Sequence, residues 1–237
     1  MESIDTRGFY DDYVGRQTDV GINARHHAIL GWLRGSGLRP EHRLLEIGCG
    51  VGTLTELLAE ALAPQGSVVG VDFSPRSIET ASERLARFAN VRLEVGDILE
   101  IEVEGSFDVV VLPDVIEHIP LEQHPALFER VASWVRPDGF VLLHYPNPHH
   151  LSWCREHRPE LLQVIDQPIQ ANVLLSNAYP HGLYLDFLQT YSIWIREGDY
   201  VVAVMRPQAG ARTFTPLPEQ PPSLLARVRK RIRRIAG

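Results

Sequence analysis

Cysteine is scarce in this sequence, and long apolar runs are missing altogether. Among 237 residues the only cysteines are Cys49 and Cys154, and they show no pairing pattern. This excludes a disulfide framework and fits a reducing compartment. No apolar run reaches the length that spans a membrane. The first residues are polar and acidic, so no signal peptide is expected there. These absences together predict a cytoplasmic protein.

Basic residues are fewer than acidic ones, 23 against 30. The formal net charge is −7 at pH 7, which argues against general nucleic-acid binding. Hydrophobic residues make up 44% of the chain, enough for a full core. The length predicts one large domain with appendages.

The most informative stretch is a glycine-rich turn between an apolar run and a helical pattern. Leu44 to Ile47 predicts a buried strand, and glycines follow at positions 48, 50 and 52. Leucines and alanines then recur at helical spacing to Leu62. A strand, a turn without side chains and a helix open a doubly wound nucleotide-binding sheet. Glycine lets a ligand lie against bare backbone.

Carboxylates recur at the ends of the predicted strands. Glu46 lies inside the first strand, and Asp72, Asp97 and Asp114 end the next three. Such side chains face the crevice where ligands bind in these sheets. Asp72 fits a residue that accepts hydrogen bonds from ribose hydroxyls. Negative charge from Glu46 and Asp114 at the base of the site suits a cationic cofactor better than a pyrophosphate.

These motifs resemble the class I S-adenosylmethionine-dependent methyltransferases, in the branch that modifies small molecules and glycans. The matching pieces, in family order, are "EIGCGVG", "GVDFS", "GDI", "LPDVIEHI" and "VRPDGFVLLHYPNP". The resemblance implies an α/β fold, a Rossmann-like doubly wound sheet with helices on both faces. It further implies the strand order 3-2-1-4-5-7-6, mostly parallel with one antiparallel strand.

The resemblance also implies the cofactor and its contacts. The cofactor would be S-adenosyl-L-methionine, converted to S-adenosyl-L-homocysteine. The residues expected to bind it are Glu46, Gly48, Cys49, Gly50, Gly52, Asp72, Phe73, Asp97, Ile98, Asp114 and Val115. Cys49 is expected to be a small buried residue of the turn and not a nucleophile.

Methyl transfer to a hydroxyl group of high pKa needs a general base, and histidine serves best near neutral pH. Five histidines fall where the crevice is expected, at positions 118, 144, 149, 150 and 181. We select His118 first, with His149 and His150 as further catalytic candidates. These three histidines and Glu117 are residue types that bind metal ions. Their spacing in the sequence, however, does not match a metal-binding motif. We therefore expect no metal.

Two helix boundaries and two turns can also be placed. Asn23 to Leu33 predicts an amphipathic helix whose apolar face holds Ile29 and Leu33. Ser74 and Pro75 predict the start of another helix. The stretch "RPDG", residues 136–139, predicts a turn before the fifth strand, and Glu197-Gly198 predicts a hairpin turn between the last two strands.

The expected organisation has four parts. Residues 1–40 would be a cap segment and helix, in which Tyr10 and Tyr13 either close the pocket or dock the segment on the domain. Residues 41–207 would be the methyltransferase domain, with an acceptor-site insertion at about 149–182. Residues 208–223 would be a proline-rich linker. Residues 224–237 would be a basic amphipathic tail, which is expected to meet an anionic membrane, at its inner face, or an acidic protein surface.

The function expected from these features is methylation of a hydroxyl of a small molecule, sugar or glycan. An N-methyltransferase of a small amine and a binding module without catalysis are the alternatives. An NAD-dependent dehydrogenase is disfavoured because the third glycine comes one place early. A nucleic-acid methyltransferase is disfavoured because "LPDVIEH" replaces a proline flanked by aromatic residues. The acceptor's identity and the oligomeric state are open.

Overall fold

A computed structural model describes residues 21–163 and 165–208. The tyrosines at positions 10 and 13, the proline-rich linker and the basic tail lie outside these described residues.

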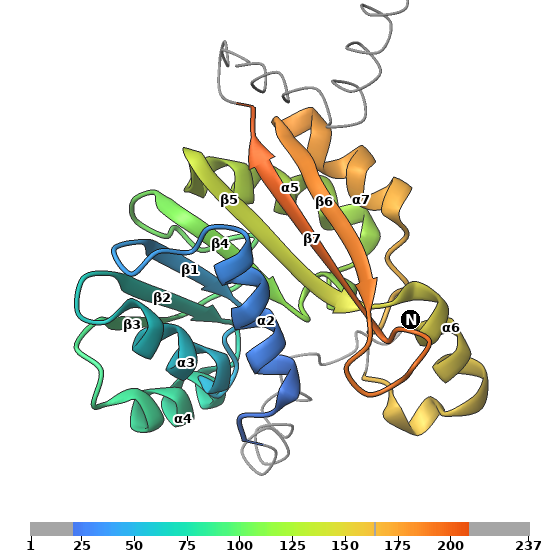
Figure 1. Cartoon of the computed structure of the whole chain (residues 1–237), viewed down its shortest axis with the longest axis horizontal. Helices are drawn as coiled ribbons and strands as arrows, with labels where there is room; N and C mark the ends of the chain where they lie inside the picture. Colours follow the sequence, from blue (N-terminus) through green and yellow to red (C-terminus); the bar gives the residue numbers. More distant parts are fainter. Residues whose placement is uncertain (1–20, 164, 209–237) are drawn as a thin grey trace, which may run out of the picture.

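The described chain is organised around a seven-stranded sheet (Figure 1). Its order is β3-β2-β1-β4-β5-β7-β6, which confirms the predicted order. Only β7 runs antiparallel, to both of its neighbours. The strands are β1 (Arg43–Ile47), β2 (Ser67–Asp72), β3 (Val91–Val95), β4 (Phe107–Pro113), β5 (Val135–Pro146), β6 (Leu183–Tyr191) and β7 (Tyr200–Pro207).

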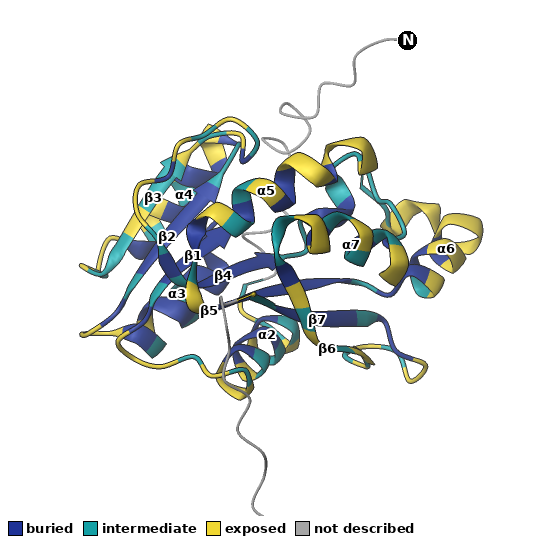
Figure 2. Cartoon of the chain, turned by 90° about the horizontal axis from the view of Figure 1, so that it is seen from above, coloured by how far each residue is buried: buried dark blue, intermediate teal, exposed yellow. Residues whose placement is uncertain are grey.

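Helices cover both faces of the sheet, as predicted (Figure 2). On one face lie α2 (Ala24–Gly35) and α3 (Thr53–Leu62), which share an apolar cluster with β1, β4, β5 and β7. Ile29 and Leu33 are fully buried in it, which confirms the predicted apolar face of α2. Complete burial of one such side chain contributes about 1.5–3 kcal/mol. The helix α4 (Pro75–Leu85) packs on α3 and β3, and it begins with the predicted Ser74 cap, which accepts a hydrogen bond from the Ser77 amide at 3.1 Å.

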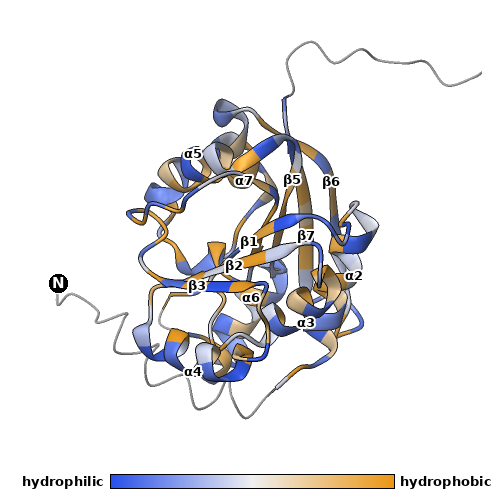
Figure 3. Cartoon of the chain, turned by 90° about the vertical axis from the view of Figure 1, so that its left-hand side faces the viewer, coloured by the Kyte–Doolittle hydropathy of each residue, from blue (hydrophilic) through white to orange (hydrophobic). Residues whose placement is uncertain are grey.

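The other face carries α5 (His124–Trp134) and α7 (Ala171–Ala178). Leu127, Val131 and Leu174 from these helices pack on the strands. Because both faces are covered, β1, β4 and β5 are buried along most of their length without alternation. Figure 3 shows hydrophobic colour along much of the central strands, whereas the edge strand β3 and the outer helices are mixed in colour.

Both turn predictions need correction. Residues 136–139 belong to β5, where they form an irregularity between the Val135–Phe107 and Phe140–Val109 pairings. The last two strands are joined by residues 192–199 and not by a two-residue turn. The Asp199 carboxylate organises this longer loop by accepting hydrogen bonds from the amides of Ile193 at 2.7 Å and Trp194 at 3.0 Å.

The region 149–182, the expected acceptor-site insertion, contains regular helices. The helix α6 (Pro148–His157) follows β5, the short turn η3 (Pro159–Leu161) comes next, and α7 is followed by η4 (Tyr179–His181). A further short turn, η1 (Ile116–His118), follows β4, and η2 (Leu121–Gln123) precedes α5. Among the described residues, no helix is long and apolar enough for a membrane span.

Candidate active site

The glycine turn lies where β1 neighbours β4, the point at which the strand order changes direction. Gly48, Gly50 and Gly52 all have positive φ, at 74°, 51° and 76°. A Cβ atom on Gly48 would approach the Val115 side chain to 2.3 Å, so the turn packs directly against the end of β4. Gly52 does not line the cavity described below; a Cβ there would meet Leu85 of α4 at 2.8 Å. Its role is therefore to let α3 approach α4.

Asp72, at the end of β2, is fixed against this turn. One of its carboxylate oxygens accepts a hydrogen bond from the Gly50 amide at 2.8 Å, and the other accepts from the Ser74 amide at 3.0 Å. The carboxylate thus stands beside exposed backbone, as expected of a group that binds ribose hydroxyls.

Glu46 lies beneath the turn and is 1% exposed. It accepts a hydrogen bond from the Thr55 hydroxyl at 2.7 Å. Burial, helped by the nearby charge of Asp72, raises the pKa of Glu46 to about 8. A cation bound above it would favour the ionised form. Burial also raises the pKa of the neighbouring Cys49 thiol, so Cys49 is inert.

The remaining predicted cofactor residues border the same space. Phe73 and Asp97 follow β2 and β3, and both line the cavity together with the buried Ile98. The Asp97 side chain accepts a hydrogen bond from the Leu99 amide at 2.9 Å, which shapes the loop after β3. Val115 closes the cavity at the end of β4.

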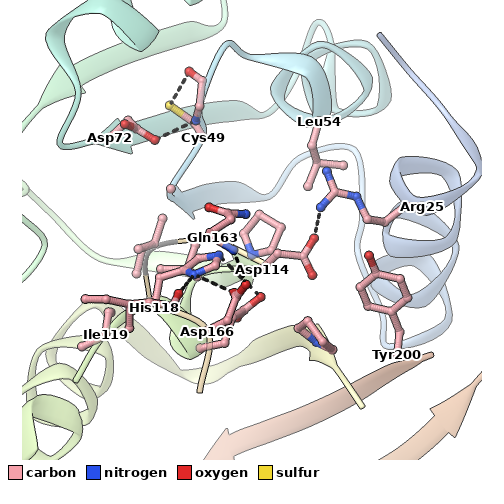
Figure 4. A pocket seen from close by; sticks show the side chains of 18 of the residues that line it. Arg25, Cys49, Leu54, Asp72, Asp114, His118, Ile119, Gln163, Asp166 and Tyr200 are labelled. Carbon is pink, nitrogen blue, oxygen red and sulfur yellow. Dashed lines mark hydrogen bonds and ion pairs between the residues drawn. The ribbon is translucent and has the colours of Figure 1, made fainter. Parts of the chain in front are cut away.

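Asp114 is the electrostatic centre of the site (Figure 4). It has a φ of 54°, the only positive value for a residue other than glycine in the described chain. Arg25 of α2 forms an ion pair with its carboxylate, and His144 of β5 contacts the other oxygen at 2.8 Å through Nδ1. Burial alone would raise the pKa of Asp114, but the charge of Arg25 and the contact with His144 outweigh it and hold the pKa at about 2.

His144 acts behind Asp114 and does not line the cavity. It is fully buried, its Nε2 lies 2.7 Å from the Tyr191 hydroxyl, and its ring stacks on Tyr200 with centroids 4.6 Å apart. It therefore supports the Asp114 carboxylate and does not face an acceptor.

Of the other histidine candidates, the structure brings two to the cavity. His118 lines it from η1, and His150 lines it from α6, where its Nε2 lies 3.4 Å from the Cys154 sulfur. His149 is exposed and lies outside the cavity lining, as does His181. His118 and His150 are thus placed for the expected chemistry, whereas His149 is not.

The cavity runs from the glycine turn to the region after β5 and has a volume of about 1290 Å³. That is larger than one drug-sized ligand needs, so a cofactor and an acceptor can be held side by side. Several lining residues were missed from the sequence. They are Arg25, Trp153, Gln163, Asp166, Asp199 and Tyr200, together with Glu117, which had been considered only as a metal ligand.

The first half of the predicted acceptor insertion lines this cavity, from His150 to Asp166. The second half does not, because α7 packs against α5 on the far face of the sheet. Among the described residues, no group of three or more His, Cys, Asp or Glu side chains is placed to hold a metal ion.

Comparison with known proteins agrees with this geometry. Residues 44–139 match a family model described as "Methyltransferase domain". The match covers less than half of the chain. It includes the glycine turn, Asp72, Asp97 and Asp114, which are among the residues assigned to the cofactor.

A demethylmenaquinone methyltransferase of Staphylococcus aureus is 31% identical over 111 residues, which are 46% of this chain and 45% of that protein. The chain therefore matches less than half the length of this relative.

Two solved structures share the fold. A TehB-like S-adenosylmethionine-dependent methyltransferase from Corynebacterium glutamicum has a TM-score of 0.63 at 18% identity, over 85% of this chain and 99% of that one. The N-methyltransferase NodS of Bradyrhizobium japonicum, solved with S-adenosyl-L-homocysteine, has a TM-score of 0.61 at 22% identity, over 78% of this chain and 86% of that one. The fold is that of S-adenosylmethionine-dependent methyltransferases, and S-adenosylmethionine is the cofactor that the glycine turn, Asp72 and the acidic floor fit.

Proposed function

We propose that this chain is an S-adenosylmethionine-dependent methyltransferase whose acceptor is a hydroxyl group of a neutral small molecule, sugar or glycan. The observation that carries the proposal is one continuous acidic cavity that joins the glycine turn to His118. The cofactor would supply a methyl group activated on a sulfonium. The chain itself would hold the acceptor oxygen in line with the sulfur–methyl bond. This positioning would supply most of the rate acceleration.

The charges of the cavity favour a neutral or cationic acceptor. Its lining contains seven carboxyl groups, from Glu46, Asp72, Asp97, Asp114, Glu117, Asp166 and Asp199. Burial raises the pKa of Glu46 and Glu117, so the negative charge comes mainly from the five aspartates. Two guanidinium groups oppose them, and each already pairs with a carboxylate, Arg25 with Asp114 and Arg158 with Glu160. Desolvating an acceptor phosphate or carboxylate here would carry a large cost without a compensating cation.

The part of the cavity near α6, where the acceptor would bind, also offers apolar surface. Trp153 of α6 and Trp194 of the loop between β6 and β7 line the cavity and are 48% and 60% exposed. Indole faces hold the apolar faces of sugar or aromatic rings, while carboxyl groups deeper in the cavity accept hydrogen bonds from hydroxyls. We assign the role of proton acceptor to His118, with His150 as the second candidate.

One alternative acceptor is supported by the same charges, since carboxyl groups would also hold the ammonium group of a small amine. The test is a turnover panel: the chain is incubated with S-adenosylmethionine and neutral glycosides, lipid-linked glycans, small phenols or small amines. Products are scored by the mass gain of one methyl group. We expect a hydroxyl compound to gain it. A gain only on amines would favour N-methylation, and cofactor binding without any transfer would favour a binding module.

The basic tail suggests where the enzyme works. Residues 224–237 combine five arginines and Lys230 with an apolar stripe. This composition is typical of helices that bind anionic membranes reversibly. We propose that the tail holds the enzyme near membrane-borne acceptors such as lipid-linked sugars.

A further inference from the structure

The segment after η3 is fastened to the short helical turn that carries His118. The Gln167 amide donates a hydrogen bond to the Glu117 carbonyl at 2.9 Å, and its side chain donates to the Ile119 carbonyl at 2.8 Å. The Asp166 carboxylate accepts from the Gln163 amide at 2.6 Å. Backbone groups on both sides of His118 therefore fix where Asp166 lies.

The Nδ1 atom of His118 faces two groups that can only accept hydrogen bonds. One is the Ile165 carbonyl, and the other is the Asp166 carboxylate, 3.2 Å away (Figure 4). Nδ1 must therefore carry a proton in the neutral imidazole. The lone pair then belongs to Nε2, which lies 3.8 Å from a Glu117 oxygen. His118 and Glu117 both line the cavity.

We propose that Asp166, with the Ile165 carbonyl, is the positioning group that makes His118 a base at Nε2. This inference rests on the proposed function. In the step, Nε2 takes the proton from the acceptor's O–H bond while the acceptor oxygen bonds to the methyl carbon. The carbon–sulfur bond breaks, and its electron pair stays on sulfur. Asp166 stabilises the imidazolium that results.

The other carboxyl groups near His118 are less suited than Asp166 to stabilise its imidazolium. Asp114 faces the ring from the end of β4, but it is already paired with Arg25 and His144. Burial and the charge of Asp114 raise the pKa of Glu117 well above its ordinary value, which favours its neutral form. One Glu117 oxygen, Oε2, is buried and has no hydrogen-bond partner among the described residues. It is available to donate to or accept from an acceptor hydroxyl.

The direct test is nitrogen NMR of histidine-labelled protein, with the His118 signals assigned by His118→Gln. We expect the neutral imidazole of wild-type His118 to carry its proton on Nδ1, with Nε2 unprotonated. Asp166→Asn keeps a hydrogen-bond acceptor but removes the charge, so the tautomer protonated on Nε2 should become more populated. The matched control is Asp186→Asn, an exposed carboxylate on β6 that pairs with Arg206 and should leave the tautomer of His118 unchanged.

A wild-type His118 with the proton on Nε2 would overturn the proposal, whether or not the variants fold. So would an unchanged tautomer ratio in a folded Asp166→Asn protein. Because these signals are read without an acceptor, they stand apart from the proposed function. With an active acceptor, Asp166→Asn should lower kcat more than it raises KM. The expected tautomer in the wild type and its expected change in Asp166→Asn, together with no methyl transfer, would instead count against the proposed function alone.

Discussion

Arg25 and Asp114, 89 positions apart in the sequence, form an ion pair that ties α2 to the end of β4. Asp114 also contacts His144, so three elements meet at one carboxylate. The left-handed backbone at Asp114 aims the carboxylate at both partners. A strained residue held by this many contacts is typical of a functional site.

This relationship predicts a pH-dependent loss of stability. The pKa of Asp114 falls from 3.8 to about 2 on folding, so the ionised form stabilises the fold above about pH 4. The contribution is roughly 2 kcal/mol and is lost as the pH falls from about 4 towards 2. Asp114→Asn, which tolerates positive φ, should therefore lower the free energy of unfolding at pH 7 by at least that amount.

Urea unfolding of wild type and variant at neutral and acidic pH measures this effect. The difference between them should shrink at about pH 2.5. The exposed-pair control Asp186→Asn should cost less than about 1 kcal/mol at either pH. An Asp114→Asn deficit that is the same at both pH values would show that the pKa of Asp114 is not depressed.

Cofactor affinity should rise with pH. The pKa of Glu46 is about 8 in the free protein, so the side chain is mostly neutral at pH 7. A cationic ligand favours its ionised form, so binding should release a proton, and affinity should increase by at most about tenfold per pH unit until about pH 8. S-adenosyl-L-homocysteine, which lacks the sulfonium charge, should show less of this dependence.

Calorimetric titrations in two buffers of different ionisation enthalpy detect the released proton. Glu46→Gln should abolish both the buffer difference and the pH dependence. Identical heats in the two buffers for the wild type would refute the coupling.

Substitution of His118 should lower turnover far more than substitution of His149. Removing a general base typically lowers turnover by about 10²-fold or more, so His118→Ala should do this with little change in cofactor affinity. His149 is exposed and outside the cavity, so His149→Ala should have a much smaller effect. Steady-state rates on any acceptor found in the panel provide the comparison. Equal effects of the two substitutions would remove His118 from its assigned role.

The basic tail should bind anionic vesicles. Each basic residue near such a surface contributes on the order of 1 kcal/mol, screened by salt. The whole chain should therefore sediment with vesicles that contain phosphatidylserine at low salt, and a chain ending at Pro222 should stay in the supernatant. The shorter chain should keep its cofactor affinity. Sedimentation of neither chain would favour an acidic protein as the partner of the tail.

The fold could be predicted, and most residues assigned to the cofactor fall on one cavity, because their signals are local. A glycine turn between an apolar run and a helical pattern is read from residues 44–62 alone, and the acids at strand ends follow from the sheet they imply. Ile29 and Leu33 were placed correctly for the same reason, since helical spacing shows which face is buried.

The acceptor half could not be predicted in the same way. Arg25 lies on an amphipathic helix whose angle to the sheet is set by packing, so nothing near it in the sequence indicates Asp114 as its partner. Asp166 reaches His118 only because Gln167 bonds back to the turn after β4. The Glu197-Gly198 turn was misplaced because Asp199 organises a longer loop through backbone amides, an arrangement without a sequence pattern.

The binding of S-adenosylmethionine itself tests the central claim most directly. Isothermal titration should show a single saturable site in the wild type and none for NAD. Asp72→Ala should weaken binding by about 1.5–3 kcal/mol, because it removes charge-assisted hydrogen bonds. Gly50→Val should abolish binding while the circular dichroism spectrum stays that of the folded protein, because a side chain would fill the space that the bare backbone leaves open. A folded wild-type protein that does not bind S-adenosylmethionine, or two variants that bind it as well as the wild type, would contradict the account.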